Sequence, residues 1–367
     1  RLLQPQSSFS FFFFPFLTTT TRLGLISTHL RAMSTMKAVV IEKQGGLEAL
    51  LYKEWPRPEA AQNTVVVKNH VIGSIDPKDE IELLCINYID TYHRSGLYKL
   101  QTPFILGREA SGEIVEIGPG ITNFKVGDRV AYMSSGSYAE YTAVPAGSIG
   151  KIPDHVSYEA AAAAVIQGLT AWTMVKDGYP VKKGDYILVH AAAGGVGLLL
   201  CQICAHLGAT VIGTVSTDAK AALARENGAA HVINYSHEDV ASRVAEITGG
   251  LGCHAVLDGV GASTWETSLA AVRRLGTLIS FGNASGVVPP VSLLTLSQKN
   301  IKLLRPTVMN YVATPEEFNK WWGELFELLD EGKIKPKVHK VYKLEDVKSA
   351  HEDLEGRKTT GKLLLEI

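Results

Sequence analysis

The sequence predicts an α/β protein with two parts, a β-rich region followed by a doubly wound parallel sheet. From Met36 onward, short runs of alternating or β-branched residues are separated by turns at glycine and proline. From about Ser157, apolar strands alternate with long helical patterns, as in a parallel sheet built from right-handed crossovers. A glycine-rich turn separates the first of those strands from an apolar helix.

The strand patterns can be placed along the chain. The β-rich region is expected to contain strands at 37–42 and 64–72. The parallel sheet is expected to contain strands at 186–190, 210–214, 231–234, 255–258 and 277–281. A helix is predicted over 315–330 and a last strand over 362–367.

The composition indicates a chain with sizeable cores. Its 367 residues are 46% hydrophobic and 20% charged, which suggests two to three domains. The formal charge of −1 gives no overall attraction to nucleic acid or acidic lipid. No apolar run is long enough to cross a membrane. Four cysteines are too few for a disulfide framework and indicate a reducing compartment, so we expect a cytoplasmic protein.

The first 35 residues differ from the rest. They contain three arginines, many Ser, Thr and Phe, and no acidic residue, which is the composition of a mitochondrial presequence. The alternative is translated upstream sequence, because the chain starts with Arg1 while Met33 and Met36 stand directly before a strand pattern. We expect disorder over 1–35 in either case, and a mitochondrial location if the presequence is genuine.

The glycine-rich turn is the strongest chemical signal. The strand 186–190 runs into Ala-Ala-Ala-Gly-Gly-Val-Gly at 191–197 and then into an apolar helix at 198–207. A strand, a glycine turn and a helix N-terminus present backbone N–H groups and a helix dipole to a pyrophosphate. Alanine replaces the first glycine of the Gly-x-Gly-x-x-Gly motif that is usual at dinucleotide sites. The position within a strand–helix–strand unit nevertheless predicts a dinucleotide site.

The end of the next strand indicates which dinucleotide is bound. An NAD site usually carries an acid there for the ribose hydroxyls. Here no acid ends the strand, whereas Ser216 and Lys220 are placed to contact a 2′-phosphate, so we predict NADPH. Asp218 is expected to cap the following helix. The alternative for Lys220 is an ordinary solvated helix lysine.

Four segments carry a family resemblance. They are 190–197, the run INYIDTYHRSG at 86–96, Gly-Leu-Thr at 168–170 and Ser-Phe-Gly-Asn at 280–283. In these segments the chain resembles the zeta-crystallin-like quinone oxidoreductases, a zinc-free branch of the medium-chain dehydrogenase/reductase superfamily. The resemblance implies a GroES-like catalytic domain formed by 36–160 and 308–367, a Rossmann domain at 161–307, an active site in the cleft, and a homodimer.

The resemblance also implies site residues. It assigns the pyrophosphate to Gly194, Gly195, Val196 and Gly197. It assigns the 2′-phosphate to Ser216, Lys220, Tyr235 and Arg357. The end of the strand already indicates Ser216 and Lys220, whereas Tyr235 and Arg357 are assigned from the resemblance. Thr170, Phe281 and Asn283 match positions near the nicotinamide or its ribose.

Tyr92 and Asn87 match cleft positions that face the nicotinamide and the substrate. A polar donor near the quinone oxygen stabilises developing negative charge there. We expect Tyr92 to be that donor and Asn87 to support it. Arg94 is a further candidate for supplying charge, with exposure to solvent as the alternative.

No catalytic metal is expected. The zinc-dependent relatives use a cysteine and the histidine of a Gly-His-Glu triplet, whereas here the triplet is Gly107, Arg108 and Glu109. No cysteine lies between Cys85 and Cys201. Cys201 and Cys204 fall inside the apolar helix after the glycine turn, so we expect them to pack in the core.

One segment departs from the family pattern. Residues 74–85 (SIDPKDEIELLC) interrupt a stretch that would otherwise read Val-Ile-Gly-Ile-Asn-Tyr. Four acids and a proline make this segment unsuited to a central strand. We expect either a surface loop or a short intron retained in the gene model, and the segment would displace Asn87 and Tyr92 if it is real.

Three functions follow from these observations. The first is NADPH-dependent reduction of quinones without a metal. The second is reduction of activated carbon–carbon double bonds in enones or enoyl thioesters, which the cleft residues do not separate from the first. The third is binding of AU-rich RNA, for which the balanced charge and the lack of an RNA-binding signature give no independent support.

Overall fold

The computed structural model describes residues 34–69, 71–72, 80–81 and 83–367. The predicted disorder over 1–35 therefore lies outside the described residues, apart from Ser34 and from Thr35, where strand β1 begins. Within the described ranges, no helix has the combined length and apolarity needed to cross a membrane.

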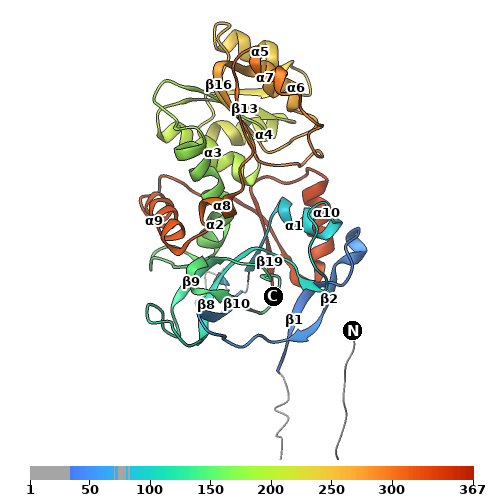
Figure 1. Cartoon of the computed structure of the whole chain (residues 1–367), viewed down its shortest axis with the longest axis vertical. Helices are drawn as coiled ribbons and strands as arrows, with labels where there is room; N and C mark the ends of the chain where they lie inside the picture. Colours follow the sequence, from blue (N-terminus) through green and yellow to red (C-terminus); the bar gives the residue numbers. More distant parts are fainter. Residues whose placement is uncertain (1–33, 70, 73–79, 82) are drawn as a thin grey trace, which may run out of the picture. The chain divides into compact units, whose positions relative to one another are not determined.

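In the described ranges, the β-rich region contains two main sheets and a separate pair of two-residue strands (Figure 1). The smaller sheet has the order β2-β1-β7, formed by Leu51–Pro56, Thr35–Ile41 and Phe104–Ile105. The larger sheet has the order β10-β3-β8-β6-β19-β18, with β9 and β11 continuing from β8. Its strands are β3 Thr64–Asn69, β6 Leu83–Ile86, β8 Glu109–Ile117, β9 Arg129–Met133, β10 Tyr141–Pro145, β11 Ile149–Lys151, β18 Val338–Lys343 and β19 Lys362–Glu366.

The parallel sheet has six strands in the order β14-β13-β12-β15-β16-β17. They are β12 Tyr186–Val189, β13 Thr210–Val215, β14 His231–Asn234, β15 Cys253–Asp258, β16 Val272–Ser280 and β17 Lys302–Leu304. All neighbouring pairs are parallel, and the order reverses between β12 and β15. Ligands of such sheets bind at the carboxyl ends of the strands beside that reversal. The predicted strands are confirmed to within a few residues; β16 starts earlier than expected.

Helices connect and flank the parallel strands. The connections are α3 Gly195–His206, α4 Asp218–Glu226, α5 Val240–Ile247 and α6 Trp265–Ala271. The other helices are α1 Tyr88–Ser95, α2 Tyr158–Thr173, α7 Leu293–Ser297, α8 Val308–Tyr311, α9 Pro315–Asp330 and α10 Val347–Glu355, and a π-helical turn, Met174–Gly178, extends α2. The predicted helix 315–330 is confirmed, with a capping box at Thr314 and a proline in its first turn.

Helix α2 joins the two regions. It contacts β8 and β9 of the larger sheet on one side and α3 of the parallel sheet on the other (Figure 1). One hydrophobic cluster consequently includes Ala131 and Met133 from β9 together with Leu199 from α3 and Val211 from β13. Cys201 and Cys204 belong to the same cluster and are fully buried, as the sequence predicts.

The segment 74–85 is only partly a loop. Leu84 and Cys85 are fully buried in β6, where Leu84 is paired with Leu365 of β19. The expectation of a surface loop is wrong for this end of the segment, because the apolar Leu-Leu-Cys sequence fills a strand position in the larger sheet. Glu80–Ile81 (β5) pairs with Val71–Ile72 (β4). Residues 73–79 and 82 lie outside the described residues.

Candidate active site

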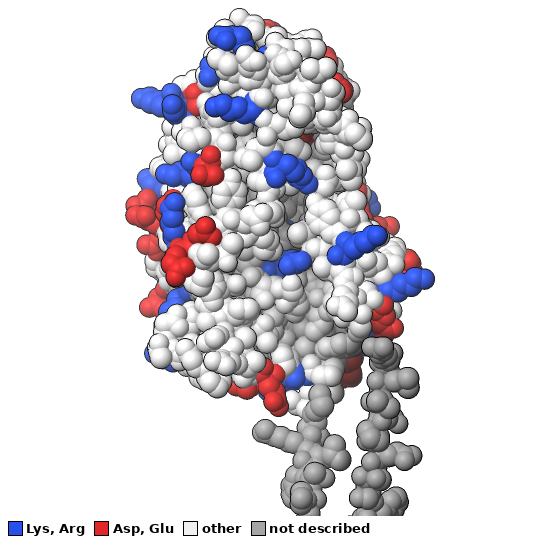
Figure 2. Space-filling view, in the orientation of Figure 1, with Lys and Arg blue, Asp and Glu red and all other residues white. Residues whose placement is uncertain are grey.

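A cavity of about 590 Å³ lies at the carboxyl ends of the parallel strands and extends to α1. It is lined by the glycine turn, the end of β13, one face of α1 and the segment 354–363. All of the predicted site residues line this cavity except Asn283 and the further candidate Arg94. Figure 2 shows the molecule hollowed near the middle of the face in view, with basic side chains at the rim.

The glycine turn lines the cavity at the N-terminus of α3. Gly194 is the N-cap of α3, and a Cβ on Gly197 would collide with the carbonyl oxygen of Ala191. A Cβ on Gly195 would collide with the side-chain amide of Gln167. Glycine at these positions therefore lets the first turn of α3 pack closely against Ala191 and Gln167, as in a pyrophosphate-binding turn.

The C-terminal segment lies directly against this turn. The Gly361 N–H donates to the carbonyl oxygen of Ala193 at 3.0 Å, and Gly361 forms a parallel bridge with Gly194. Gly361 has a φ of +73°, and a Cβ there would collide with the carbonyl of Lys337. The segment after α10 thus forms one wall of the cavity beside the glycine turn.

Four predicted side chains lie at the end of the cavity beyond β13: Ser216, Lys220, Tyr235 and Arg357. Thr217 caps α4 by accepting a hydrogen bond from the Lys220 N–H at 3.3 Å. The expectation that Asp218 is the cap is therefore wrong. Asp218 is the first residue of the helix, and its carboxylate accepts from the Asn234 side chain at 2.9 Å.

Lys220 and Arg357 are held together without an acidic partner. The Lys220 Nζ donates to the backbone carbonyl of Arg357 at 2.7 Å, so Lys220 is not an ordinary solvated lysine. Burial and the nearby positive charge of Arg357 lower the pKa of Lys220. Neither cation forms an ion pair with any residue in the described part of the chain. Two unpaired cations beside a serine and a tyrosine suit a dianionic phosphate.

At the other end of the cavity, Tyr92 projects from α1. Its hydroxyl oxygen accepts a hydrogen bond from the Asn283 N–H at 3.0 Å. Burial raises the pKa of Tyr92 to about 12, so the hydroxyl stays protonated. No acceptor for that proton is found among the residues the structure describes. Tyr92 therefore has its oxygen fixed and its proton available to a ligand.

Tyr98 and Arg305 complete this end of the cavity, and the sequence analysis missed both. The Tyr98 ring meets that of Tyr92 edge-on, with centroids 5.3 Å apart. With the Asn283 amide oriented to satisfy both of its polar atoms, its oxygen accepts from Tyr98 Oη at 3.2 Å and from Arg305 Nη2 at 3.0 Å. Asn283 thus organises the tyrosines through hydrogen bonds. Arg305 follows β17 directly, and no local pattern marked it as a site residue.

The chain matches relatives over most of its length. It is 43% identical to a quinone oxidoreductase of Pseudomonas aeruginosa over 333 residues, covering 90% of this chain and 99% of the relative. The chain belongs to the quinone oxidoreductases. Residues 80–154 match the family described as alcohol dehydrogenase GroES-like domain, and residues 195–327 match the family described as zinc-binding dehydrogenase.

Two further comparisons bear on the site of this quinone oxidoreductase. A crystal structure of the Escherichia coli quinone oxidoreductase complexed with NADPH is 40% identical, with a TM-score of 0.85 over 90% of this chain and all of that one. A 2-haloacrylate reductase from a Burkholderia species is 35% identical over 338 residues, covering 89% of this chain and 98% of the relative. The predicted GroES-like and Rossmann fold class is confirmed.

In this quinone oxidoreductase, Asn87 is held by a buried ion pair. Its side-chain nitrogen donates to Glu109 at 2.7 Å, and its oxygen accepts from Lys362 Nζ at 2.8 Å. Lys362 and Glu109 form an ion pair with both side chains almost fully buried. Asn87 also stands at the N-cap of α1. It supports Tyr92 by fixing the start of the helix, and no direct bond joins the two side chains.

Arg94 neither faces solvent nor reaches the cavity. Its guanidinium, 5% exposed, forms two hydrogen bonds with the Glu355 carboxylate, at 2.8 and 3.0 Å. Arg108, at the position of the histidine in the zinc-dependent relatives, is placed 3.2 Å from His93 Nε2. These charged groups do not line the cavity, and we refer to their side of the helix as the region behind α1. Only neutral side chains of α1 line the cavity.

Proposed function

We propose that this quinone oxidoreductase reduces quinones with NADPH, and that Tyr92 donates a hydrogen bond to the quinone oxygen. The observation that carries the proposal is the Tyr92 hydroxyl, whose oxygen is held by the Asn283 N–H and whose proton has no acceptor among the described residues. The relatives named quinone oxidoreductases and the E. coli enzyme solved with NADPH support the assignment.

The residues present fit the cofactor. The turn of Gly194, Gly195, Val196 and Gly197 would hold the pyrophosphate. Ser216, Lys220, Tyr235 and Arg357 would hold the 2′-phosphate, because the two cations have no other anion. Thr170 and Phe281 line the same cavity, and the nicotinamide would lie beside them. When bound, NADPH supplies the hydride.

Tyr92 acts on the acceptor rather than on the cofactor. Negative charge develops on the quinone oxygen as hydride arrives at the ring, and a fixed O–H donor stabilises that charge. Because burial raises the pKa of Tyr92 to about 12, the residue remains a neutral donor instead of an anion that would repel the developing charge. Polarisation by a hydroxyl takes the place of a zinc ion, consistent with Arg108 at the histidine position and with Glu109 paired to Lys362.

A second candidate is the reduction of activated double bonds. The relative named 2-haloacrylate reductase is 35% identical across nearly its whole length. A carbonyl oxygen conjugated to a double bond also becomes negative when hydride adds at the distal carbon, so the same Tyr92 donor serves this reaction.

We also propose the division into a catalytic domain formed by 36–160 and 308–367 and a cofactor domain at 161–307, and assembly as a homodimer. Edge strand β17 pairs only with β16 in the described chain, and Leu293 and Leu294 nearby are 79% and 78% exposed. An open strand edge beside exposed leucines is a surface that a second copy would cover. Acidic and basic side chains both occur on the face in Figure 2, and the formal net charge is −1, so RNA binding gains no support.

Cofactor oxidation by the full chain tests the proposal. NADPH and NADH are each offered with an ortho-quinone, a para-quinone and an enone. We expect NADPH with a quinone to give the highest kcat/KM. Turnover of the enone alone assigns the second candidate, and equal use of NADH and NADPH contradicts the assignment of the 2′-phosphate residues.

A further inference from the structure

We propose that Arg94 and Glu355 are positioning residues that couple occupation of the 2′-phosphate site to the position of Tyr92. The link passes through residues 355–361, from the last residue of α10 to the start of β19, which we call the tail segment. This inference rests on the proposed use of NADPH. It adds that the 2′-phosphate contributes to the rate of the reaction as well as to cofactor affinity.

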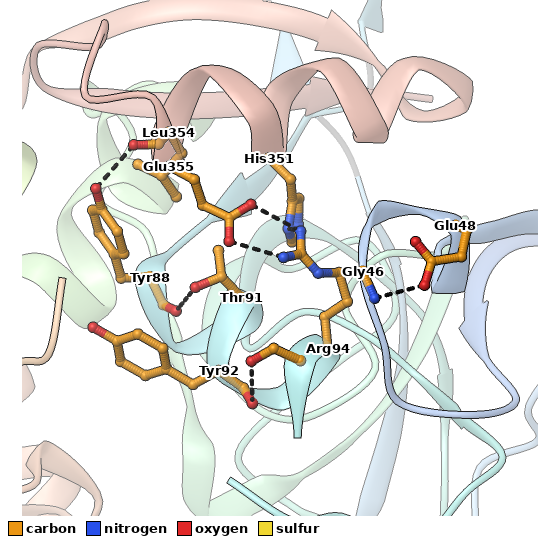
Figure 3. A network of polar contacts seen from close by, with 10 residues as sticks. Gly46, Glu48, Tyr88, Thr91, Tyr92, Arg94, His351, Leu354 and Glu355 are labelled. Carbon is orange, nitrogen blue, oxygen red and sulfur yellow. Dashed lines mark hydrogen bonds and ion pairs between the residues drawn. The ribbon is translucent and has the colours of Figure 1, made fainter. Parts of the chain in front are cut away.

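The first part of the link is between α1 and the end of α10, as Figure 3 shows. Arg94, two residues after Tyr92, holds Glu355 with both terminal nitrogens and also lies 3.2 Å from His351 Nδ1. The Tyr88 hydroxyl donates to the carbonyl of Leu354 at 2.9 Å. Helix α1 is therefore attached near both of its ends to the last turn of α10.

The second part is within the tail segment. Arg357 lies two residues after Glu355 and has a φ of +57°, a left-handed conformation that a side chain larger than glycine rarely adopts. Its carbonyl accepts from Lys220 Nζ at 2.7 Å. A phosphate bound by Lys220 and Arg357 would hold this conformation and the end of α10 together.

The tail segment then reaches the substrate end by a second route. Gly361 bonds to the glycine turn, and the next residue, Lys362, bonds to Asn87 at the start of α1. Both ends of α1 are thus attached to the same short stretch of chain that carries Arg357. Bidentate arginine–carboxylate pairs fix orientation as well as distance, so the Arg94–Glu355 pair sets the orientation of α1 relative to the end of α10.

The test measures the effect of the 2′-phosphate on α1 in the absence of the nicotinamide. Adenosine 2′,5′-bisphosphate carries the 2′-phosphate and lacks the nicotinamide, so it does not reach Tyr92 directly, and 5′-AMP lacks both. Hydrogen exchange of the α1 amides is followed by mass spectrometry at saturating concentrations of each probe. We expect the bisphosphate to slow α1 exchange about 5-fold relative to 5′-AMP in the wild-type chain.

Glu355→Gln removes the charge with little change of shape. We expect this variant to bind the bisphosphate and to lose the additional protection of α1. Its kcat with NADPH should fall about 5-fold, toward the NADH value, while kcat with NADH stays unchanged. Glu352→Gln is the matched control, because Glu352 lies on the exposed side of α10 and makes no side-chain hydrogen bond within the described chain. It should behave like the wild type.

The outcomes are distinguishable. Equal α1 exchange with the two probes in the wild type, while the bisphosphate binds, overturns the coupling and leaves NADPH use intact. Equal loss of kcat with NADPH and NADH in Glu355→Gln shows a merely structural role and overturns it too. If the bisphosphate binds no better than 5′-AMP, the 2′-phosphate assignment itself fails, and the coupling with it. Arg94→Lys, which keeps the charge and loses the bidentate geometry, replaces Glu355→Gln if that variant does not fold.

Discussion

At the end of the cavity beside α4, Lys220 and Arg357 lie together with no acidic partner, whereas behind α1 the charges of Glu109, Lys362 and Arg94 are buried and paired. The two ends of one cavity thus use charge differently. A site for a phosphate keeps its cations unpaired and accessible to the ligand. The substrate end presents the Tyr92 hydroxyl and one cation, Arg305, which donates to the Ser280 carbonyl and to Tyr98 Oη. The buried pairs behind α1 hold the helix that carries Tyr92. The difference predicts that charge removal affects cofactor affinity at one end and stability at the other.

The largest effect is expected behind α1. Lys362→Met leaves the Glu109 carboxylate buried without its partner, and breaking such a pair costs about 3–5 kcal/mol of unfolding free energy. Urea unfolding measures this loss. Lys358→Met is the control, since Lys358 pairs with Asp353 at the surface, and we expect a change below about 0.5 kcal/mol. Equal losses in the two variants would contradict the structural role of the buried pair.

The glycine turn comes next. Gly197→Ala puts a methyl group against the carbonyl of Ala191, so the turn must open and its N–H groups lose their alignment. We expect the Kd for NADPH to rise about 100-fold, or ~3 kcal/mol, in a fluorescence titration. Gly323→Ala, in α9 with no atom near its Cβ position, should leave the Kd unchanged. An unaltered Kd in Gly197→Ala would contradict the assignment of the pyrophosphate to this turn.

The part of the cavity formed by the glycine turn and the end of β13 was largely predictable from the sequence. The glycine turn, Ser216 and Lys220 fall within two short segments that follow consecutive strands, and strands of a parallel sheet place such segments together. The substrate end depends on pairs far apart in the chain. Lys362 and Glu109 are separated by 253 residues, and Asn283 and Tyr92 by 191. No local periodicity specifies such pairs. Sequence patterns likewise did not indicate Arg305, or the partner of Arg94.

A smaller effect is expected at the unpaired cations. Lys220→Ala removes one of the two cations, and we expect the Kd for NADPH to rise about 10-fold while the Kd for NADH stays unchanged. Lys348→Ala, an exposed lysine on α10, serves as the control. A similar loss for both cofactors would place Lys220 outside the 2′-phosphate site and would remove the contrast between the two ends.

The smallest effect concerns pH. Burial raises the pKa of Tyr92 to about 12, so its neutral, proton-donating form is the populated one throughout the range below that value. Ionisation of Tyr92 should therefore produce no fall in kcat between pH 7 and about 10. A pH–rate profile checks this expectation. A fall in that range that disappears in Tyr92→Phe would show a lower pKa and a different chemical role.

The measurement that tests the account most directly is the turnover of a quinone by Tyr92→Phe at saturating NADPH, with the Kd for NADPH determined in parallel. Loss of a donor aligned with developing oxyanion charge predicts a fall in kcat of about 100-fold. The Kd for NADPH should change less than about 2-fold, because Tyr92 forms no hydrogen bond with the residues assigned to the phosphates in the described part of the chain. Tyr52→Phe, on strand β2, should match the wild type. A Tyr92→Phe variant with unchanged kcat would contradict the central role given to this hydroxyl.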